Sequence, residues 1–222
     1  EELKEDAKKY VDDRRSPIVQ RADAEAINEQ DMLPADPVTV VLSEAGWIRC
    51  AKGHDVDVEN LNYRASDKYL SHAQGKSNQR VYVLDEAGRS YALAINSLPS
   101  ARGMGEPLSS KLAPANGIGF KQVFIADDEA ELIVASNKGY GFKTQAKQLD
   151  TSAKAGKAFL SLAEGASALD LQTVDGATHL AVLSSAGRLL VLDLEELPSL
   201  NKGKGNKLIQ LEPKDQIVSM TM

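Results

Sequence analysis

The sequence predicts an all-β protein built from about four repeated units, and two observations lead to this class. A hairpin-like decapeptide occurs four times, as VLSEAGWIRC (41–50), VLDEAGRSYA (83–92), VASNKGYGFK (134–143) and VLSSAGRLLV (182–191). A second segment, rich in glycine and basic residues, follows these decapeptides at a nearly constant distance. Repeats of about 40–50 residues with several strands each are typical of propeller-like arrays, because one unit cannot bury its sheet face alone.

Each decapeptide has the pattern of a strand, a tight turn and a second strand. The turn glycines are Gly46, Gly88, Gly139 and Gly187, and a valine stands five residues before each of them. A tight hairpin needs a positive φ near its turn, and glycine adopts this conformation without a Cβ clash. We therefore predict four β-hairpins that turn at these glycines.

The start of the chain has a different pattern. Residues 1–14 are predicted to form a helix, because Leu3, Ala7 and Tyr10 fall on one helical face. Residues 15–37 are polar and contain several prolines, so we expect a linker there.

The repeats occupy residues 38–222. The last residues, DQIVSMTM (215–222), are expected to start a further unit, so we expect a domain that is truncated at its C-terminus.

Composition bounds the class of protein. The chain has 222 residues, of which 42% are hydrophobic, and a formal net charge of −6. Residues 1–37 carry 11 acids and 6 bases, so the repeat region is nearly neutral and local clustering decides which surfaces are basic. No apolar run is long enough to cross a bilayer. The single Cys50 excludes an internal disulfide framework and favours a reducing compartment.

The glycine-rich basic segments are candidates for phosphate contacts. They are LPSARGMG (98–105), LDTSAKAG (149–156) and LPSLNKGKG (197–205), with a looser counterpart at AQGKSNQR (73–80). Their one acidic residue is Asp150. Small residues let a backbone approach a phosphate, and Lys or Arg neutralises it. The predicted contact residues in or just after these segments are Lys76, Arg80, Arg102, Lys154, Lys157, Lys202, Lys204 and Lys207.

Basic residues beside the hairpins extend this candidate surface. These are Arg49, Lys52, Arg89 and Arg188. The alternative for any single residue is an ordinary exposed charge, and turns are rich in Gly, Ser and Lys for structural reasons alone. The repetition of the segments favours a common role.

Other kinds of site are weakly supported. A zinc site needs about four ligands within tetrahedral reach of one ion, and Cys50 and the three histidines are scattered along the chain, so no metal is expected. Ser, His and Asp are present without a nucleophile-elbow context, so no catalytic residue is expected.

Several of these segments resemble a known family. LSEAGWIRCAKGHD (42–55), GKSNQRVYVLDEAGRSYA (75–92), LPSARGMGEPL (98–108), SNKGYGF (136–142) and LPSLNKGKGNK (197–207) resemble the C-terminal domain of the A subunit of bacterial type IIA topoisomerases, most closely topoisomerase IV. The resemblance implies a β-pinwheel of about four blades, with strands exchanged between neighbours and a basic rim that bends duplex DNA. KGKG (202–205) is only a partial likeness to the basic box of gyrase. A gyrase A-type wrapping domain is therefore an alternative, as is a protein-interaction module without DNA binding.

The resemblance also implies a role. EELKEDAKKY and DDRRSPI, within residues 1–18, resemble the helix that leaves the catalytic core. The domain would contact the transfer duplex and set substrate preference in supercoil relaxation and decatenation. The whole enzyme would be an ATP-hydrolysing DNA topoisomerase, with ATP and Mg²⁺ supplied through its core and its partner subunit. Tyr63 is followed by Arg64 but lacks the remaining cleavage motif, so this part of the enzyme is expected to cut nothing.

The expected partners follow from this role. They are double-stranded DNA, the rest of a homodimeric A subunit, the ATPase subunit of a heterotetramer, and chromosome-organising proteins. We expect a cytoplasmic, nucleoid-associated chain that is not transmembrane, or one bound peripherally at the inner membrane. No cofactor is expected in this part of the enzyme.

Overall fold

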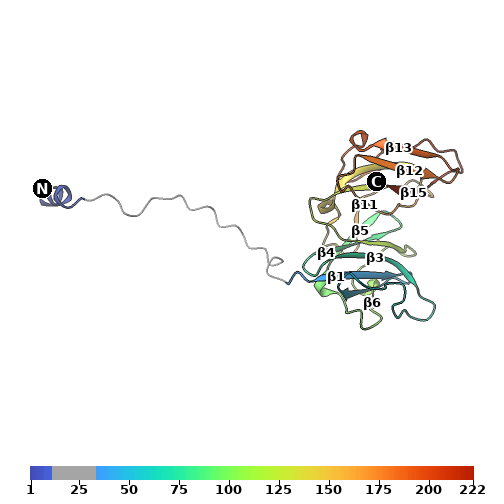
Figure 1. The fold of residues 1–222 in the computed structure, drawn as a ribbon, viewed down its shortest axis with the longest axis horizontal. Coiled ribbons are helices and arrows are strands. Elements are labelled where there is room, and N and C mark those ends of the chain that lie inside the picture. Colours follow the sequence, from blue (N-terminus) through green and yellow to red (C-terminus); the bar gives the residue numbers. More distant parts are fainter. Residues whose placement is uncertain (12–33) are drawn as a thin grey trace.

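The computed structural model describes residues 1–11 and 34–222, which form one short helix and four small antiparallel sheets (Figure 1). The predicted N-terminal helix is confirmed as α1, Glu2–Lys9, and Tyr10 ends it by leaving helical geometry at φ −117°. Residues 12–14 of the expected helix, and most of the expected linker, lie outside the described residues. The first strand begins at Pro37.

Each sheet is one blade, and its strands run in order from an inner to an outer edge. Blade 1 contains β3 (Tyr69–Lys76), β1 (Pro37–Ser43), β2 (Trp47–Lys52) and β6 (Glu106–Pro107). Blade 2 contains β7 (Phe120–Phe124), β4 (Arg80–Asp85), β5 (Arg89–Ala94) and β10 (Lys157–Ala158). Blade 3 contains β11 (Gln172–Thr173), β8 (Glu131–Ala135), β9 (Tyr140–Gln145) and β14 (Asn206–Lys207). Blade 4 contains β15 (Ile217–Thr221), β12 (His179–Ser184) and β13 (Leu189–Asp193). Short 3-10 helices occupy Ile95–Ser97, Leu108–Ser110, Ala146–Leu149 and Leu194–Glu196.

The four predicted hairpins are confirmed. They are β1–β2, β4–β5, β8–β9 and β12–β13, and all are antiparallel. The turn glycines Gly46, Gly88, Gly139 and Gly187 have φ values of +76°, +76°, +85° and +79°. This left-handed conformation is the one that strains residues carrying a Cβ, so the sequence pattern has a direct backbone cause.

The outer strands are exchanged between blades. Strands β6, β10 and β14 each follow the hairpin of one blade but pair with the preceding blade. The loop 98–105, for example, lies along β2: the Cys50 amide donates to the Pro99 carbonyl at 2.8 Å, and the Ala101 amide donates to the Cys50 carbonyl at 2.9 Å. Each loop, with the outer strand that follows it, therefore binds a strand that is about 50 to 70 residues away in the sequence.

The apolar core lies between blades rather than within one. A first cluster, which includes Val40 and Tyr91, joins blades 1 and 2. Two further clusters join blade 2 to blade 3 and blade 3 to blade 4. Adjacent inner strands also meet through side chains; the Gln122 amide oxygen, for example, accepts from the Leu171 amide at 2.9 Å. The repeats are therefore stabilised by their neighbours, as expected for a stacked array.

Blade 1 has its free face covered by the segment 53–68. The Thr39 hydroxyl donates to the Gly53 carbonyl at 2.7 Å, and the Arg64 guanidinium lies 4.4 Å from the centre of the Trp47 ring. Because no blade precedes blade 1 in the described part of the chain, this segment buries residues that a neighbour would otherwise cover.

Blade 4 differs at both its face and its edge. Leu189 and Val191 on β13 are 67% and 56% exposed, and among the described residues no strand pairs with the outer edge of β13. The expectation that residues 215–222 start a further unit is wrong. Strand β15 pairs with β12 as the inner strand of blade 4, with Val182 opposite Met220. In every unit the inner strand follows the hairpin, and residues 217–221 take that position here.

In blades 1 and 4, an aspartate just before the inner strand forms hydrogen bonds with the hairpin turn of the same blade. Asp67 precedes β3 and accepts from the Ala45 amide at 2.9 Å. Burial raises the pKa of the Asp67 carboxyl, but hydrogen bonds from Ser43 and from backbone amides outweigh this and hold it below its usual range. Asp215 precedes β15, and a hydrogen bond from the Ser185 hydroxyl is the main cause of its lowered pKa.

No helix in the described residues is both long and apolar enough to cross a membrane.

Candidate nucleic-acid interface

The three predicted glycine-basic loops lie on the outer edges of blades 1, 2 and 3. Each loop ends in a short outer strand, so the strand exchange brings all three loops to corresponding places. Four of the predicted contact residues, Arg102, Lys154, Lys202 and Lys204, are exposed on these loops. Lys157 and Lys207 lie on the outer strands β10 and β14 themselves. The outer edges therefore carry six of the twelve predicted cations.

The glycines that end these loops allow the close packing. Gly205 has φ +77°, and a Cβ placed there would lie 2.1 Å from the Gly141 carbonyl oxygen. Gly105 has φ +92°, and its Cβ would lie 2.4 Å from the Ile48 carbonyl oxygen. Glycine is needed at both positions for backbone conformation and for space. The neighbouring cations are thus held close to the sheet edge.

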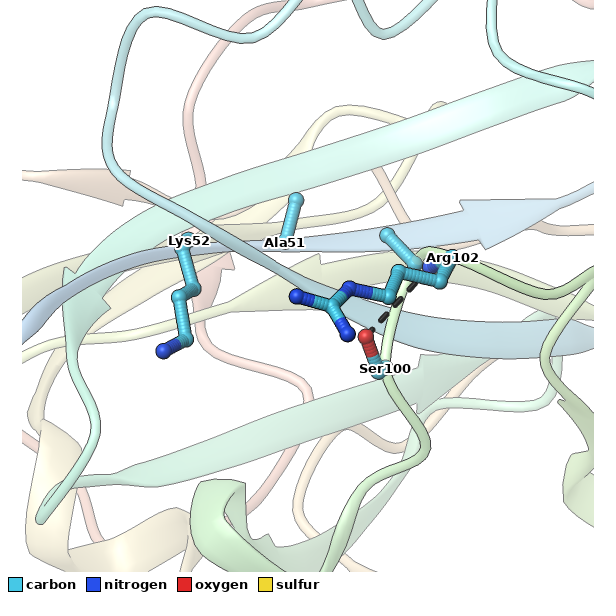
Figure 2. Close-up of a pocket in the computed structure, with 5 residues that line it drawn as sticks. Ala51, Lys52, Ser100 and Arg102 are labelled. Atoms are coloured by element: carbon cyan, nitrogen blue, oxygen red, sulfur yellow. Dashed lines mark hydrogen bonds between the residues drawn. The ribbon is translucent and has the colours of Figure 1, made fainter.

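Lys52 joins this surface from blade 1. It is exposed at the end of β2 and shares a notch with Arg102, which belongs to the loop that follows blade 2's hairpin (Figure 2). The sequence predicted both residues separately, and the fold brings them together.

Blade 3 orients its cations through neutral partners. The Lys204 ammonium lies 3.7 Å from the centre of the Tyr140 ring, and the Lys207 ammonium donates to the Gln210 side-chain oxygen at 2.7 Å. Neither contact cancels the positive charge, so both lysines remain able to attract an anion.

Three predicted arginines have partners that occupy their donors or balance their charge. Arg80 forms an ion pair with Asp150, the acid within the second loop. A guanidinium nitrogen of Arg188 lies 3.5 Å from a carboxylate oxygen of Glu212. Arg89 donates to the Ala155 carbonyl at 3.0 Å and so supports the loop backbone. These residues are weaker candidates for phosphate contact than the sequence suggested.

Arg49 corrects the sequence prediction. Its side chain is directed beneath the segment 53–68, and the residue is only 2% exposed. It donates to the Asn62 carbonyl at 2.7 Å and to the Gly103 carbonyl at 3.2 Å, and it lies 4.5 Å from the centre of the Tyr63 ring. A buried guanidinium with these partners cannot reach a phosphate, so Arg49 has a structural role.

Lys76 also departs from the expected arrangement. The segment 73–80 is not an outer loop; it ends the inner strand β3, turns, and starts β4. Lys76 pairs with Pro37 on β1, and β1 separates it from β2. The sequence suggested a counterpart because the segment is also glycine-basic, but periodicity does not specify which edge of a sheet a segment joins.

Lys138 is a candidate that the sequence interpretation missed. It precedes the turn glycine of the third hairpin and, with Tyr140 and Lys207, lines a groove of about 300 Å³. Its position in the turn was the available signal, since an uncharged alanine stands at the corresponding place in the three other hairpins. Glu212 and Asp215 line the same groove, which weakens its attraction for anions.

Metal chemistry finds no support in the described part of the chain, where no group of three or more His, Cys, Asp or Glu side chains could hold an ion. Burial raises the pKa of the Cys50 thiol, which makes it a weaker ligand and nucleophile.

Comparison with known proteins agrees with this architecture. A family model described as "DNA gyrase C-terminal domain, beta-propeller" matches residues 130–175 and 178–222. The chain is 52% identical to the A subunit of DNA topoisomerase 4 from Haemophilus influenzae over 211 residues, which are 95% of this chain and 28% of that protein. It is 49% identical to the protein of the same name from Pseudomonas aeruginosa, covering 99% of this chain and 29% of that protein.

A solved structure gives the same result. The E. coli ParC C-terminal domain superposes with a TM-score of 0.78 at 41% identity, covering 84% of this chain and 79% of that one. The chain thus spans less than a third of the curated relatives but most of this solved domain. Together these matches show that the chain belongs to the family of C-terminal β-pinwheel domains of bacterial topoisomerase IV A subunits, which are related to the A subunit of gyrase.

Proposed function

We propose that this chain binds duplex DNA along the outer edges of blades 1 to 3, as the non-catalytic C-terminal domain of a topoisomerase IV A subunit. The observation that carries the proposal is the position of the exposed cations. Arg102, Lys154 and Lys202 come from three separate loops, and each loop borders the outer edge of a successive blade. Positive charge repeated along successive edges suits a DNA backbone, whose phosphates also repeat.

The contacts are expected to be to phosphates rather than bases. The loops offer Lys and Arg side chains beside small residues, and the described blades contain no α-helix that could enter a groove. Binding should therefore be insensitive to sequence and weakened by salt. About seven of the candidate cations are exposed or lie on the outer strands, and have no carboxylate partner among the described residues. Each phosphate that a cation neutralises contributes about −0.9 to the slope of log affinity against log salt concentration. If most but not all of the seven bind phosphates, this slope is about −4 to −6.

In the intact enzyme this domain would hold the transfer duplex and influence which DNA crossings are processed. Relaxation of supercoils and decatenation of daughter chromosomes would be the outcome. Cleavage, ATP hydrolysis and Mg²⁺ binding would belong to the rest of the homodimeric A subunit, together with the ATPase subunit. Such a role places the protein on the nucleoid in the cytoplasm, where chromosome-organising proteins are also available as partners.

The test is a fourfold charge reversal on the three loops: Arg102→Glu, Lys154→Glu, Lys202→Glu and Lys204→Glu. Duplex affinity is expected to fall at least about a hundredfold, because several phosphate contacts are lost and repulsion replaces them. The matched control is Lys4→Glu, Lys8→Glu, Lys9→Glu and Lys68→Glu, which changes the net charge equally at exposed residues of α1 and of the segment before β3, none of which belongs to an outer strand or its loop. Equal losses in both variants would contradict a localised interface.

A protein-interaction module is the second candidate, favoured by the exposed apolar residues Leu189, Val191 and Val218 on blade 4. Under this alternative the unchanged chain has negligible DNA affinity and the loop reversals have no effect. A gyrase-type wrapping domain is tested by ligating nicked DNA circles in the presence of the chain. Only tight wrapping would leave supercoils of one handedness in the ligated circles.

A further inference from the structure

We propose that the notch between the end of β2 and the loop 98–105 is a seat for one phosphodiester group of duplex DNA, held jointly by Lys52 and Arg102. This inference rests on the proposed function and goes further, because it assigns two cations from different blades to a single phosphate. The notch has a volume of about 530 Å³ and is lined by Ala51, Lys52, Ser100, Ala101 and Arg102.

The fold brings the two cations to the same notch. Lys52 ends β2 in blade 1, and Arg102 lies two residues beyond Ser100, which bridges to Cys50 on the same strand. The backbone hydrogen bonds of Cys50 with Pro99 and Ala101 hold the loop in this register. In Figure 2 the Arg102 guanidinium extends toward the side of the notch where Lys52 lies. The pair therefore depends on the strand exchange between blades.

The charges in the notch have no balancing partner among the described residues. Both side chains are exposed, and within the described ranges neither forms an ion pair with a carboxylate, unlike Arg80 and Arg188. Two cations that share one opening repel each other, and an anion between them removes that repulsion. The unbalanced charge therefore favours an anionic ligand here.

Ser100 adds a neutral donor to the same opening. Its hydroxyl oxygen accepts from the Arg102 amide at 3.3 Å, so its proton remains available to a ligand oxygen (Figure 2). The other lining residues, Ala51 and Ala101, are small and apolar. This combination offers donors without charged acceptors or aromatic stacking surfaces, which suits a phosphate oxygen rather than a base.

The arrangement is specific to blade 1. Lys52 stands six residues after its turn glycine, and the corresponding residues of the other blades are Ala94, Gln145 and Asp193. None of these is basic, so a second cation at the strand end is not a general requirement of the repeat. The difference indicates a function for Lys52 beyond folding.

The experiment measures the salt dependence of duplex binding for Lys52→Gln, Arg102→Gln and the double variant. If both residues neutralise one phosphate, either cation alone retains much of that neutralisation. Each single change should then lower the magnitude of the log–log slope by about 0.3 or less, and the double change by about 0.9, which exceeds the sum of the single changes. The affinity losses should be non-additive in a double-mutant cycle.

If Lys52 and Arg102 bound two separate phosphates, each single change would lower the magnitude of the slope by about 0.9 and the double change would lower it by about 1.8. That result would overturn the shared phosphate site. Unchanged slopes in all three variants would overturn it as well. The control pair Arg80→Gln and Arg188→Gln removes two arginines that already face carboxylates and should leave the slope nearly unchanged. If the unchanged chain shows no salt-dependent binding at all, the proposed function itself fails, which is a distinct result.

Discussion

Replacing Gly205 with alanine tests the strand exchange that builds the outer edges. The new Cβ would lie 2.1 Å from the Gly141 carbonyl oxygen and 2.4 Å from its carbon, in backbone that cannot move without breaking β9. A non-glycine residue at φ +77° costs about 1–2 kcal/mol, and forced overpacking costs about 1–3 kcal/mol. We therefore expect the free energy of unfolding to fall by about 2–5 kcal/mol.

Two other glycines separate the causes. Gly165 has φ +69° with no atom near its would-be Cβ, so Gly165→Ala should cost only the conformational part, about 1–2 kcal/mol. Gly103 has neither a positive φ nor a close neighbour, so Gly103→Ala should be nearly neutral. Urea denaturation of the three variants measures the series, since the midpoint shift times the slope gives the change in stability.

The loss of stability is expected to be largest for Gly205→Ala, smaller for Gly165→Ala and smallest for Gly103→Ala, and this order can be refuted. If Gly205→Ala costs no more than Gly165→Ala, the close approach of the loop to β9 does not limit the fold, and the reasoning fails. The same variant should weaken duplex binding, because Lys202 and Lys204 belong to the displaced loop.

Three further changes have definite expected outcomes. Arg49→Ala should lower the free energy of unfolding by about 2–4 kcal/mol, because it removes a buried hub of hydrogen bonds, as chemical denaturation would show; a fall of about one in the DNA salt slope would instead mean that Arg49 reaches a phosphate. Asp67→Asn should flatten the loss of stability below about pH 4. The reason is that the pKa of the Asp67 carboxyl is lower in the folded state than in the unfolded state. Its charged form therefore stabilises the fold above the ordinary carboxyl pKa, and this stabilisation is lost as the pH falls through the folded-state pKa. An unchanged acid-unfolding profile would contradict this. Ser66→Gly should raise the melting temperature slightly, because Ser66 has φ +69° and glycine relieves about 1 kcal/mol of strain; a decrease would show that the Ser66 side chain stabilises the segment 53–68.

The hairpins and the cation-bearing loops follow from the amino-acid sequence alone. Glycine at Gly46 and its three counterparts reports a positive φ, and that requirement is local, so pattern alone predicts the turns. The same holds for the exposed cations Arg102, Lys154 and Lys202, because short polar segments between strands lie at the surface.

The contacts across blades, in contrast, follow from the three-dimensional arrangement of the strands. Lys52 and Arg102 share a notch because the loop after the hairpin of blade 2 returns to blade 1. Arg80 faces Asp150, which lies 70 residues further along the chain, for the corresponding reason in blade 2. Arg49 is buried because the segment 53–68 covers blade 1. The first two contacts depend on which strand pairs with which blade, and the third depends on where the segment 53–68 folds back. Local periodicity carries no information about either.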